Sequence, residues 1–406
     1  MKTVAFIDLH LEGHRLAYMR YHVKIVAESG HHVICITPDA GKIRNWINEN
    51  YPDLSENIKY YPFLMYELHV PHKPGQFNGL LFQIRLWRKY DKIIDNACIE
   101  LNVKIDLVFF NYLDSLLGNY LHPLLIDLFF KYKWTGIYFH PKLLRLHPEL
   151  LQKRASLSDI DIVLTSKNCI AIAFHDEGII NGQSYRLNNK KVLLFPEIAD
   201  DTLPNHDHKI YKEIREKAKG RITTGIVGVE PFKSSGELMR LAKKMDPSLY
   251  FFAFTGPFEE FFLDYFFSET TAYEFKEFIS HPPENVYINL GPLKEGMEYN
   301  SVLSAFDIVY IIYKDFPSAS NRLTKASQLK RLVIADEKYC VGEDVQNYNL
   351  GITVNGDDVD SIEKGIITLR ERIIRNDFPL KEWEIYSARN SIDVLKQKFK
   401  ELIGMI

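Results

Sequence analysis

Short apolar runs bounded by turn residues alternate with helical patterns along almost the whole chain, in two successive arrays. This alternation is typical of parallel β-sheets covered by helices, because the connection between two parallel strands usually contains a helix. The predicted strands of the first array are 3–7, 32–37, 107–111, 136–139, 162–165 and 192–195. Those of the second array are 223–227, 249–255, 286–290, 308–312, 332–335 and 352–354. The sequence therefore predicts an α/β protein with two doubly wound, Rossmann-like domains.

The lengths of the two arrays indicate where the domains begin and end. A chain of 406 residues is longer than the roughly 250–300 residues at which a single core stops growing. The polar stretch 200–209 carries a proline, two histidines and no apolar periodicity, so we interpret it as a linker. We expect a first domain at 1–203, a second domain at 204–378 and a helical C-terminal segment at 379–406. The other predicted helices are 15–28, 236–245, 299–304, 322–329 and 359–375.

Composition and charge exclude several classes of protein. The formal net charge of −3 gives no electrostatic reason to expect nucleic acid as a partner. The four cysteines are isolated from one another in the sequence, which suits a reducing cytosol. The first residues lack the pattern of a secretory signal, and the most apolar long stretch, 113–130, is interrupted by polar residues and Pro123. We therefore expect a cytoplasmic protein without a transmembrane helix.

In open parallel sheets, ligands bind beyond the carboxyl ends of the strands, so the loops that follow the strands are candidate sites. The loop after the first strand contains Gly13 and His14, and the helix start that follows offers free N–H groups to an anion or a sugar hydroxyl. A plain strand-to-helix turn explains the same glycine equally well. His140 follows the strand 136–139 and can exchange a proton near neutral pH. From position alone, we favour a structural role for His140.

The first loop of the second array has an anion-binding pattern. Gly228 follows the first strand, and Lys233 precedes a predicted helix, so that a cation and a helix start would meet at one anion. A solvated lysine is the alternative interpretation. Gly256 lies in the loop after the next strand, where it would face the same region.

The segment 315–337 contains a second pattern of this kind. Small polar residues lead into a helix that has four candidate residues near its start: Ser320, Asn321, Arg322 and Lys325. If Ser318 or Ser320 capped this helix, backbone N–H groups and two cations would remain for an anionic ligand. A pyrophosphate fits that chemistry.

Several segments of the chain together resemble the retaining glycosyltransferases of family 4. The segments are the loop at Gly13, IYFHP at His140, residues 159–178, KVLLFPEIADDTL at 191–203, the loop at Lys233 and SNRLTKASQLKRLVIA at 320–335. The resemblance spans nearly the whole chain. It implies a GT-B fold, in which two Rossmann-like domains face each other across the active-site cleft and a last helix crosses back onto the first domain. It also implies that the first domain binds the acceptor and the second a nucleotide-sugar donor.

The resemblance implies a role for each candidate residue. Lys233, Asn321 and Arg322 would contact the donor phosphates, and His140 would lie near the reacting sugar. His14 and His140 would contact the acceptor, whereas Lys233, Arg322 and His140 would be catalytic. The remaining donor-side candidates are Gly13, Gly228, Gly256, Ser320 and Lys325. The two cations would stabilise the negative charge that develops on the leaving diphosphate.

The chain departs from the family at two donor contacts. Lys325 stands where the family has a glutamate that contacts the donor ribose, and Val229 stands where it has an arginine. Lys325 would then bind a differently charged donor, or the ribose contact would move to Glu337 or Glu343. No acidic pair with DxD spacing lies near a candidate loop. We therefore expect a metal-independent enzyme that needs no cofactor besides its nucleotide-sugar substrate.

Three functions are consistent with these patterns. The first is glycosyl transfer to a saccharide or lipid-linked saccharide, as in glycan or surface polysaccharide synthesis. The second is a sugar-nucleotide 2-epimerase, which would need clustered acidic and histidine groups that the sequence does not show. The third is a non-catalytic scaffold that has lost its donor contacts. Convergence of Lys233, Asn321 and Arg322 on one pocket would favour an enzyme over a scaffold.

The segment 78–95 predicts a basic amphipathic helix. Leu81, Ile84, Trp87 and Ile94 fall on or near one stripe, with four cations close by at 85, 88, 89 and 92. Such helices can lie in the interface of a membrane, here at its inner face. We favour the alternative in which the stripe packs on the first sheet and the basic edge is solvated.

Overall fold

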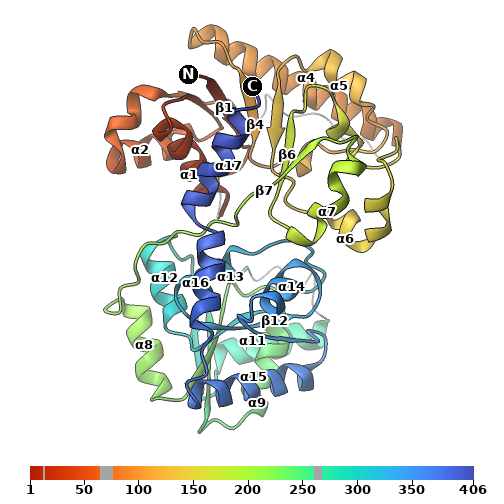
Figure 1. Ribbon diagram of the computed structural model, residues 1–406. Coiled ribbons are helices and arrows are strands. Elements are labelled where there is room, and N and C mark those ends of the chain that lie inside the picture. The colour runs from red at the N-terminus through yellow and green to blue at the C-terminus, as the bar shows by residue number, and fades with distance from the viewer. Residues whose placement is uncertain (12–13, 65–75, 260–267) are drawn as a thin grey trace. The chain divides into compact units, whose positions relative to one another are not determined.

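The chain divides into two compact units. The computed structural model describes residues 1–11, 14–64, 76–259 and 268–406 (Figure 1). Unit 1 contains residues 1–198 and 391–406, and unit 2 contains residues 199–390. The expected C-terminal segment 379–406 is therefore split between them, because α16 (Leu380–Arg389) belongs to unit 2 and α17 (Ile392–Ile403) to unit 1.

Unit 1 is built on a parallel sheet with the strand order β3-β2-β1-β4-β5. Its strands are β1 (Thr3–Ile7), β2 (His32–Ile36), β3 (Ile58–Tyr61), β4 (Leu107–Phe110) and β5 (Trp134–Gly136). Two further parallel strands, β6 (Ala171–Phe174) and β7 (Lys191–Leu194), pair with each other. Isolated bridges from Trp134 to Cys169 and from Ile137 to Ala173 continue the parallel arrangement from β5 to β6.

Both faces of this sheet are buried under helices. On β1, Ala5 and Ile7 face the cluster that includes α4 (Gln76–Glu100) and α5 (Pro123–Phe129), whereas Val4 and Phe6 face the opposite cluster. That second cluster is formed with α1 (His14–Glu28), α2 (Ala40–Asn50) and α17, which Figure 1 shows on the other side of β1 and β4. Burial on both faces explains why the central strands β1 and β4 are almost continuously apolar instead of alternating.

Three predicted features of unit 1 differ from the structure. The run Ile162–Thr165 is a short 3-10 helix and not a strand, and the strand of this region is β6. An apolar run of four residues does not distinguish the two structures by periodicity, which explains the error. The strand expected at 136–139 ends earlier, as β5, and β3 was not predicted. Two further α-helices of unit 1 are α6 (Lys142–Leu146) and α7 (Glu177–Arg186).

The amphipathic segment at 78–95 forms part of α4. Trp87 and Ile94 are fully buried in the core of unit 1, whereas Arg85, Arg88 and Lys92 are exposed. The apolar stripe thus packs on the sheet, which is the arrangement that we favoured. Within the described part of the chain, no helix combines the length and the apolar character needed to span a membrane.

A buried arginine joins the end of α7 to the segment just before the 3-10 helix Ile162–Thr165. The Nε atom of Arg186 lies 2.6 Å from Asp161 Oδ2, and its Nη2 lies 3.0 Å from Asp159 Oδ2. The side chains of Arg186 and Asp161 are 0% and 1% exposed. Asp159 and Asp161 therefore have Arg186 as a structural partner within unit 1.

Unit 2 is a second doubly wound sheet, with the order β10-β9-β8-β11-β12-β13. Its strands are β8 (Ile222–Val227), β9 (Tyr250–Thr255), β10 (Val286–Asn289), β11 (Ile308–Ile311), β12 (Leu332–Asp336) and β13 (Gly351–Val354). All pairs are parallel. Every strand predicted for the second array is present, with ends that differ by no more than one residue.

Two groups of helices pack with this sheet. One group is α9 (Ser235–Lys244), α11 (Glu269–Ser280) and α15 (Val359–Ile374). The other is α8 (Lys209–Ala218), α12 (Met297–Ser304), α13 (Asn321–Gln328) and α16. The helix α14 (Tyr339–Asn347) packs beside β12 and β13. The two helices expected to begin at an anion, α9 and α13, thus belong to different groups.

Candidate anion-binding site

The strand order of unit 2 places two loops at the point where ligands bind to doubly wound sheets. The order runs from β8 to β10 in one direction and from β11 to β13 in the other. In such sheets the ligand lies beyond the carboxyl ends of the strands at this reversal. The loop after β8 contains residues 228–234, and the loop after β11 contains residues 312–320. Both patterns singled out in the sequence therefore lie at the same edge.

Gly228 is the point at which the charged groups of this edge meet. A Cβ atom placed on Gly228 would lie 2.6 Å from Lys233 Nζ, 3.3 Å from Arg322 Nη2 and 3.4 Å from Glu230 Oε1. The residue also has φ +74°, a conformation that favours glycine. Its N–H donates to the Thr255 carbonyl at 2.7 Å. The absence of a side chain therefore gives two cations access to one small volume.

Gly256 supports this arrangement from the neighbouring loop. It has φ +85°, and a Cβ placed there would lie 2.7 Å from the Gly228 nitrogen. Its own N–H donates to the Asn289 carbonyl at 3.1 Å. The role of Gly256 here is a close approach of two backbones, which a side chain would prevent.

Lys233 reaches Gly228 from the residues just before α9. Its side chain is buried, and its ammonium contacts the Glu230 carboxylate. Burial, and secondly the charge of Arg322, lower the pKa of Lys233 to about 7. The residue therefore changes its charge near neutral pH.

Arg322 reaches the same point from the first turn of α13. Its Nε donates to the Tyr299 hydroxyl at 2.9 Å, and its Nη1 donates to the Tyr313 hydroxyl at 2.6 Å. Both hydrogen bonds go to phenols, which carry no negative charge to balance that of the guanidinium. They also fix the plane of the guanidinium, so that Nη2 is the nitrogen beside Gly228.

The starts of α9 and α13 lack side-chain caps. Ser234 precedes α9, and its buried hydroxyl has no hydrogen-bond partner within the described residues. Ser320 precedes α13, but it lies 3.3 Å from the Tyr313 hydroxyl and does not cap the helix as we expected. Asn321 is half-buried as the first residue of α13. Free N–H groups at helix starts favour an anion, together with Lys233 and Arg322.

Lys325 lies one turn further along α13 but points elsewhere. Its side chain is 1% exposed, and its Nζ lies 2.6 Å from Glu295 Oε1. The same ammonium lies 3.1 Å from Asn300 Oδ1, and Asn300 in turn donates to the carbonyls of Asp200 and Thr202. Lys325 thus helps to hold the first residues of unit 2 in place through Asn300. It does not belong to the group of charged side chains around Gly228.

Solved structures with the same architecture identify the fold. The chain is similar to a sucrose-phosphate synthase from Thermosynechococcus elongatus, with a TM-score of 0.67, 14% identity and coverage of 99% of this chain and 98% of that one. It is similar to HepE from Anabaena in complex with UDP and glucose, with a TM-score of 0.65, 12% identity and full coverage of both chains. A glycosyltransferase from Rickettsia africae gives a TM-score of 0.60 at 12% identity, over 99% of this chain and 97% of that one.

The fold is GT-B. No protein-family model matches the sequence, and no curated protein matches it either. At these identities the likeness establishes the fold, and the chemistry of the site has to be argued from the residues themselves.

Within this GT-B fold, three side chains of the site were not among the sequence candidates: Glu230, Tyr299 and Tyr313. Each comes from a different segment, and neither tyrosine has a spacing that signals its role. Glu230 lies three residues before Lys233, which is the only local signal that could have suggested the contact. The two tyrosines become visible only when α12 and the loop after β11 are placed beside Arg322.

His140 lies in the loop after β5, at the carboxyl ends of the strands of unit 1. The backbone N–H groups of Phe139 and His140 donate to the Asp114 carboxylate at 3.0 and 2.8 Å, and the His140 ring lies edge-on to Tyr112 at 5.8 Å. Burial raises the pKa of Asp114, while His140 and the two N–H donors act against that effect. Gly13 lies outside the described residues, as does the side chain of His14.

A hollow of about 510 Å³ lies beside Asp114 in unit 1. Its lining includes Gln83, Gly118, Asn119 and Tyr120. Amide and carboxylate groups beside an exposed aromatic ring suit a ligand that carries many hydroxyl groups.

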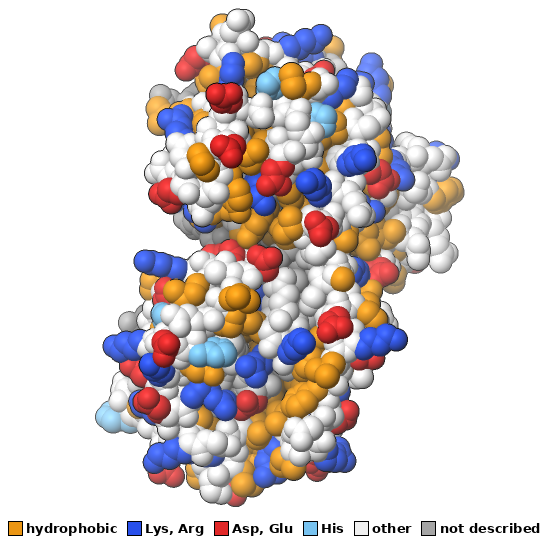
Figure 2. All heavy atoms as spheres, turned by 60° about the vertical axis from the view of Figure 1, so that its left-hand side comes forward, with side chains coloured by type: hydrophobic (Ala, Val, Ile, Leu, Met, Phe, Trp, Pro, Cys, Tyr) orange, Lys and Arg blue, Asp and Glu red, His pale blue; other side chains and the backbone are white. Residues whose placement is uncertain are grey.

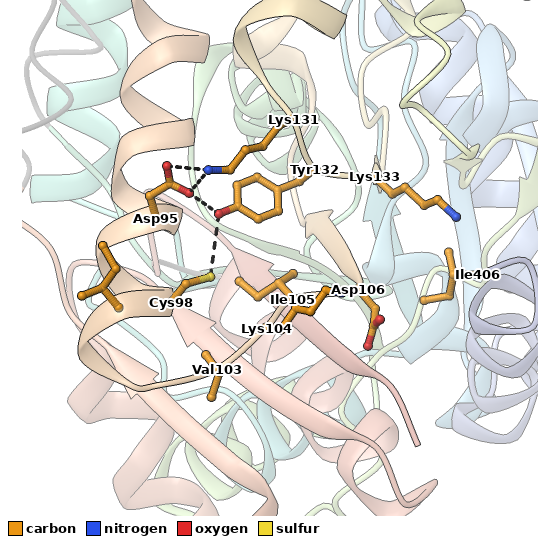
Figure 3. Close-up of a pocket in the computed structure, with 11 residues that line it drawn as sticks. Asp95, Cys98, Val103, Lys104, Ile105, Asp106, Lys131, Tyr132, Lys133 and Ile406 are labelled. Atoms are coloured by element: carbon orange, nitrogen blue, oxygen red, sulfur yellow. Dashed lines mark hydrogen bonds and ion pairs between the residues drawn. The ribbon is translucent and has the colours of Figure 1, made fainter.

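A second hollow of unit 1, of about 700 Å³, lies at the opposite edge of the sheet (Figure 3). Asp106 and Lys133, which precede β4 and β5, belong to its lining. Lys131 lies 2.6 Å from the Asp95 carboxylate, to which the Tyr132 hydroxyl also donates. These groups satisfy one another at the amino ends of the strands, so we do not treat this hollow as the candidate site.

Surface charge does not single out another site on the face shown in Figure 2. Acidic and basic side chains are interspersed there over both units, without a field of one sign.

Proposed function

We propose that this chain is a glycosyltransferase that transfers a sugar from a nucleoside-diphosphate sugar to a saccharide or lipid-linked saccharide. The convergence of Lys233 and Arg322 on Gly228 carries the proposal, because it supplies two cations and two helix starts at the ligand-binding edge of a GT-B fold. A diphosphate would provide the negative charge that the phenols around Arg322 do not. HepE structures contain UDP and UDP-glucose, which supports a uridine nucleotide as the first donor to test.

The cations also suit the chemistry of the transfer. When the bond between the sugar and the diphosphate breaks, negative charge develops on the departing oxygen, and groups already in position lower the barrier. We assign this role to Lys233 and Arg322, with no metal ion, and we place His140 near the reacting sugar. Retention of configuration follows from the resemblance to family 4 and is part of the proposal.

We assign the acceptor to unit 1. The hollow beside Asp114 offers amide, carboxylate and phenol groups at the carboxyl edge of the sheet. Saccharide hydroxyls can both donate to and accept from such groups. We propose that His140, whose backbone N–H donates to the Asp114 carboxylate, takes part in binding the acceptor.

The first experiment is a thermal-shift screen of the full chain against UDP-, GDP-, ADP-, CMP- and TDP-sugars. A ligand that binds only the folded protein raises its melting temperature. We expect a selective shift with one base, lost in Arg322→Leu but kept in Arg375→Leu, a control at an exposed arginine on the far end of unit 2. No shift with any nucleotide, confirmed by calorimetry, would contradict the proposal and favour the scaffold.

Donor binding is expected to weaken as the pH rises above 7. Because the pKa of Lys233 is lowered to about 7, the free protein loses this charge with rising pH, whereas a bound phosphate favours the charged form. The dissociation constant should therefore rise by about tenfold between pH 7 and pH 8.5, as linkage of one proton requires. Calorimetric titrations at both values measure this.

The matched control for the pH effect is Lys233→Arg. Arginine stays charged throughout this range, so its dissociation constant should change little. The donor does not produce the effect itself, because each of its two phosphates carries a single negative charge that does not change between pH 7 and pH 8.5. Equal pH dependence in both proteins would contradict the assignment to Lys233.

We also propose that any contact with anionic lipid uses α5 and the basic edge of α4. Leu124 and Leu128, one turn apart on α5, are 66% and 73% exposed. Arg88 of α4 lies over the Phe129 ring at 4.0 Å. Exposed leucines beside cations suit a lipid interface. In flotation with anionic liposomes, we expect the wild type in the floating fraction and the double variant Leu124→Ser/Leu128→Ser outside it. Absence of the wild type from the floating fraction would contradict this part of the proposal.

A further inference from the structure

The anion site contains a carboxylate of the chain itself. Glu230 contacts the Lys233 ammonium, and its Oε1 lies 3.4 Å from the same Cβ position on Gly228 that the two cations approach. Its side chain is 22% exposed, so it is not sealed in a core. A negative group at this point opposes the binding of phosphates. A site selected only for tight binding would have no reason to keep it there.

We propose that Glu230 is a specificity-determining residue that shifts the selectivity of the site away from the nucleoside-diphosphate product and toward the nucleotide-sugar donor. This inference rests on the proposed function. In the donor, each phosphate has one ester bond and shares the anhydride bond, and each carries one negative charge. When the sugar is transferred, the bond from its anomeric carbon to the phosphate oxygen breaks, and its electron pair stays on the terminal phosphate. A bond from the anomeric carbon to an acceptor oxygen forms, and the proton of that acceptor hydroxyl passes to the solvent. The terminal phosphate has a second pKa of about 6, so the product carries about one more negative charge at pH 7.5.

The added charge appears on the phosphate that the cations stabilise. Repulsion by Glu230 acts on both nucleotides, but it grows with the charge of the ligand and therefore affects the product more. Lys233 and Arg322 alone would favour the product for the same reason. With Glu230 present, the net charge of the three groups is at most +1, which reduces that preference. Product release limits turnover in many enzymes, so Glu230 favours turnover.

The test compares two ligands in matched variants of the full chain. Dissociation constants for UDP and UDP-glucose, or for the corresponding pair of the base selected by the screen, are measured by calorimetry at pH 7.5. In Glu230→Gln we expect UDP to bind about tenfold more tightly and UDP-glucose about threefold more tightly, so that the ratio of the two constants shifts about threefold toward the product. Product inhibition of turnover should strengthen by a similar factor.

Three controls separate charge from structure. Glu230→Asp keeps the charge and should retain the wild-type ratio of the two dissociation constants. Glu363→Gln removes a carboxylate that pairs with Lys244 at the other end of α9 and should leave both constants unchanged. If the melting temperature shows that Glu230→Gln does not fold, the same two dissociation constants are measured in Glu230→Ala.

An unchanged ratio in Glu230→Gln, or equal weakening of both ligands, would overturn the inference and leave the proposed function standing. Equal weakening would mean that Glu230 only holds Lys233 in place. Failure of the wild type to bind either nucleotide would instead overturn the proposed function, and this inference with it.

Discussion

Gly228→Ala is expected to weaken nucleotide binding at least about a hundredfold. An alanine Cβ would lie 2.6 Å from Lys233 Nζ and 3.3 Å from Arg322 Nη2, so both cations would have to move. Charge-assisted hydrogen bonds contribute about 1.5–3 kcal/mol each, and the loss of two corresponds to a factor of about a hundred or more. Calorimetry with the nucleotide selected by the screen measures the change.

Gly220→Ala is the matched control for this variant. Gly220 has φ +80°, close to the +74° of Gly228, but a Cβ placed there meets nothing within 4 Å. An alanine in this backbone conformation costs about 1–2 kcal/mol, so both variants should lose similar stability while only Gly228→Ala loses binding. Binding by Gly228→Ala within threefold of the wild type would show that the phosphates lie elsewhere.

Arg186→Leu is expected to destabilise unit 1 by about 3–5 kcal/mol, because removal of one partner leaves a buried charge uncompensated. That charge is on Asp161, which Arg186 contacts through two nitrogens at 2.6 and 2.7 Å. Urea unfolding followed by tryptophan fluorescence reports mainly on unit 1, because three of the four tryptophans, Trp46, Trp87 and Trp134, lie there and Trp383 lies in unit 2.

Two further variants test the explanation. Arg154→Leu removes an exposed arginine of the same region that donates to Asn188, and it should change stability by less than about 1 kcal/mol. Arg186→Leu combined with Asp161→Leu should recover part of the loss, since it removes both charges. If the double variant were less stable than Arg186→Leu alone, the buried charge would not be the cause.

The strands of unit 2 could be predicted closely because each is a buried apolar run with turn residues on both sides. The doubly wound order follows from the same alternation of strands and helices. Unit 1 was harder, since Ile162–Thr165 has the composition of a strand but forms a 3-10 helix. Four apolar residues can be buried in either conformation, and the contacts of Ser166 and Asn168 with Asp127 beyond this run are not visible in the sequence.

The candidate site was predictable only in its local parts. Lys233 and Arg322 stand at helix starts that follow strands, a pattern that spacing reveals. The direction of Lys325 depends on Glu295, which lies thirty residues earlier in the chain and meets it only in the folded unit. Tyr299 and Tyr313 were overlooked for a similar reason, because aromatic residues are common and their hydroxyl partners come from distant segments.

The split of the C-terminal segment has a consequence for the order in which the protein forms during synthesis. Leu395, Phe399 and Leu402 of α17 belong to the core cluster of β1 and α1, so one layer of unit 1 is synthesised only after the whole of unit 2. Unit 2 is complete by residue 390. The nascent chain can therefore finish the unit proposed to bind the nucleotide while the first unit still exposes Phe6 and Phe109 to chaperones.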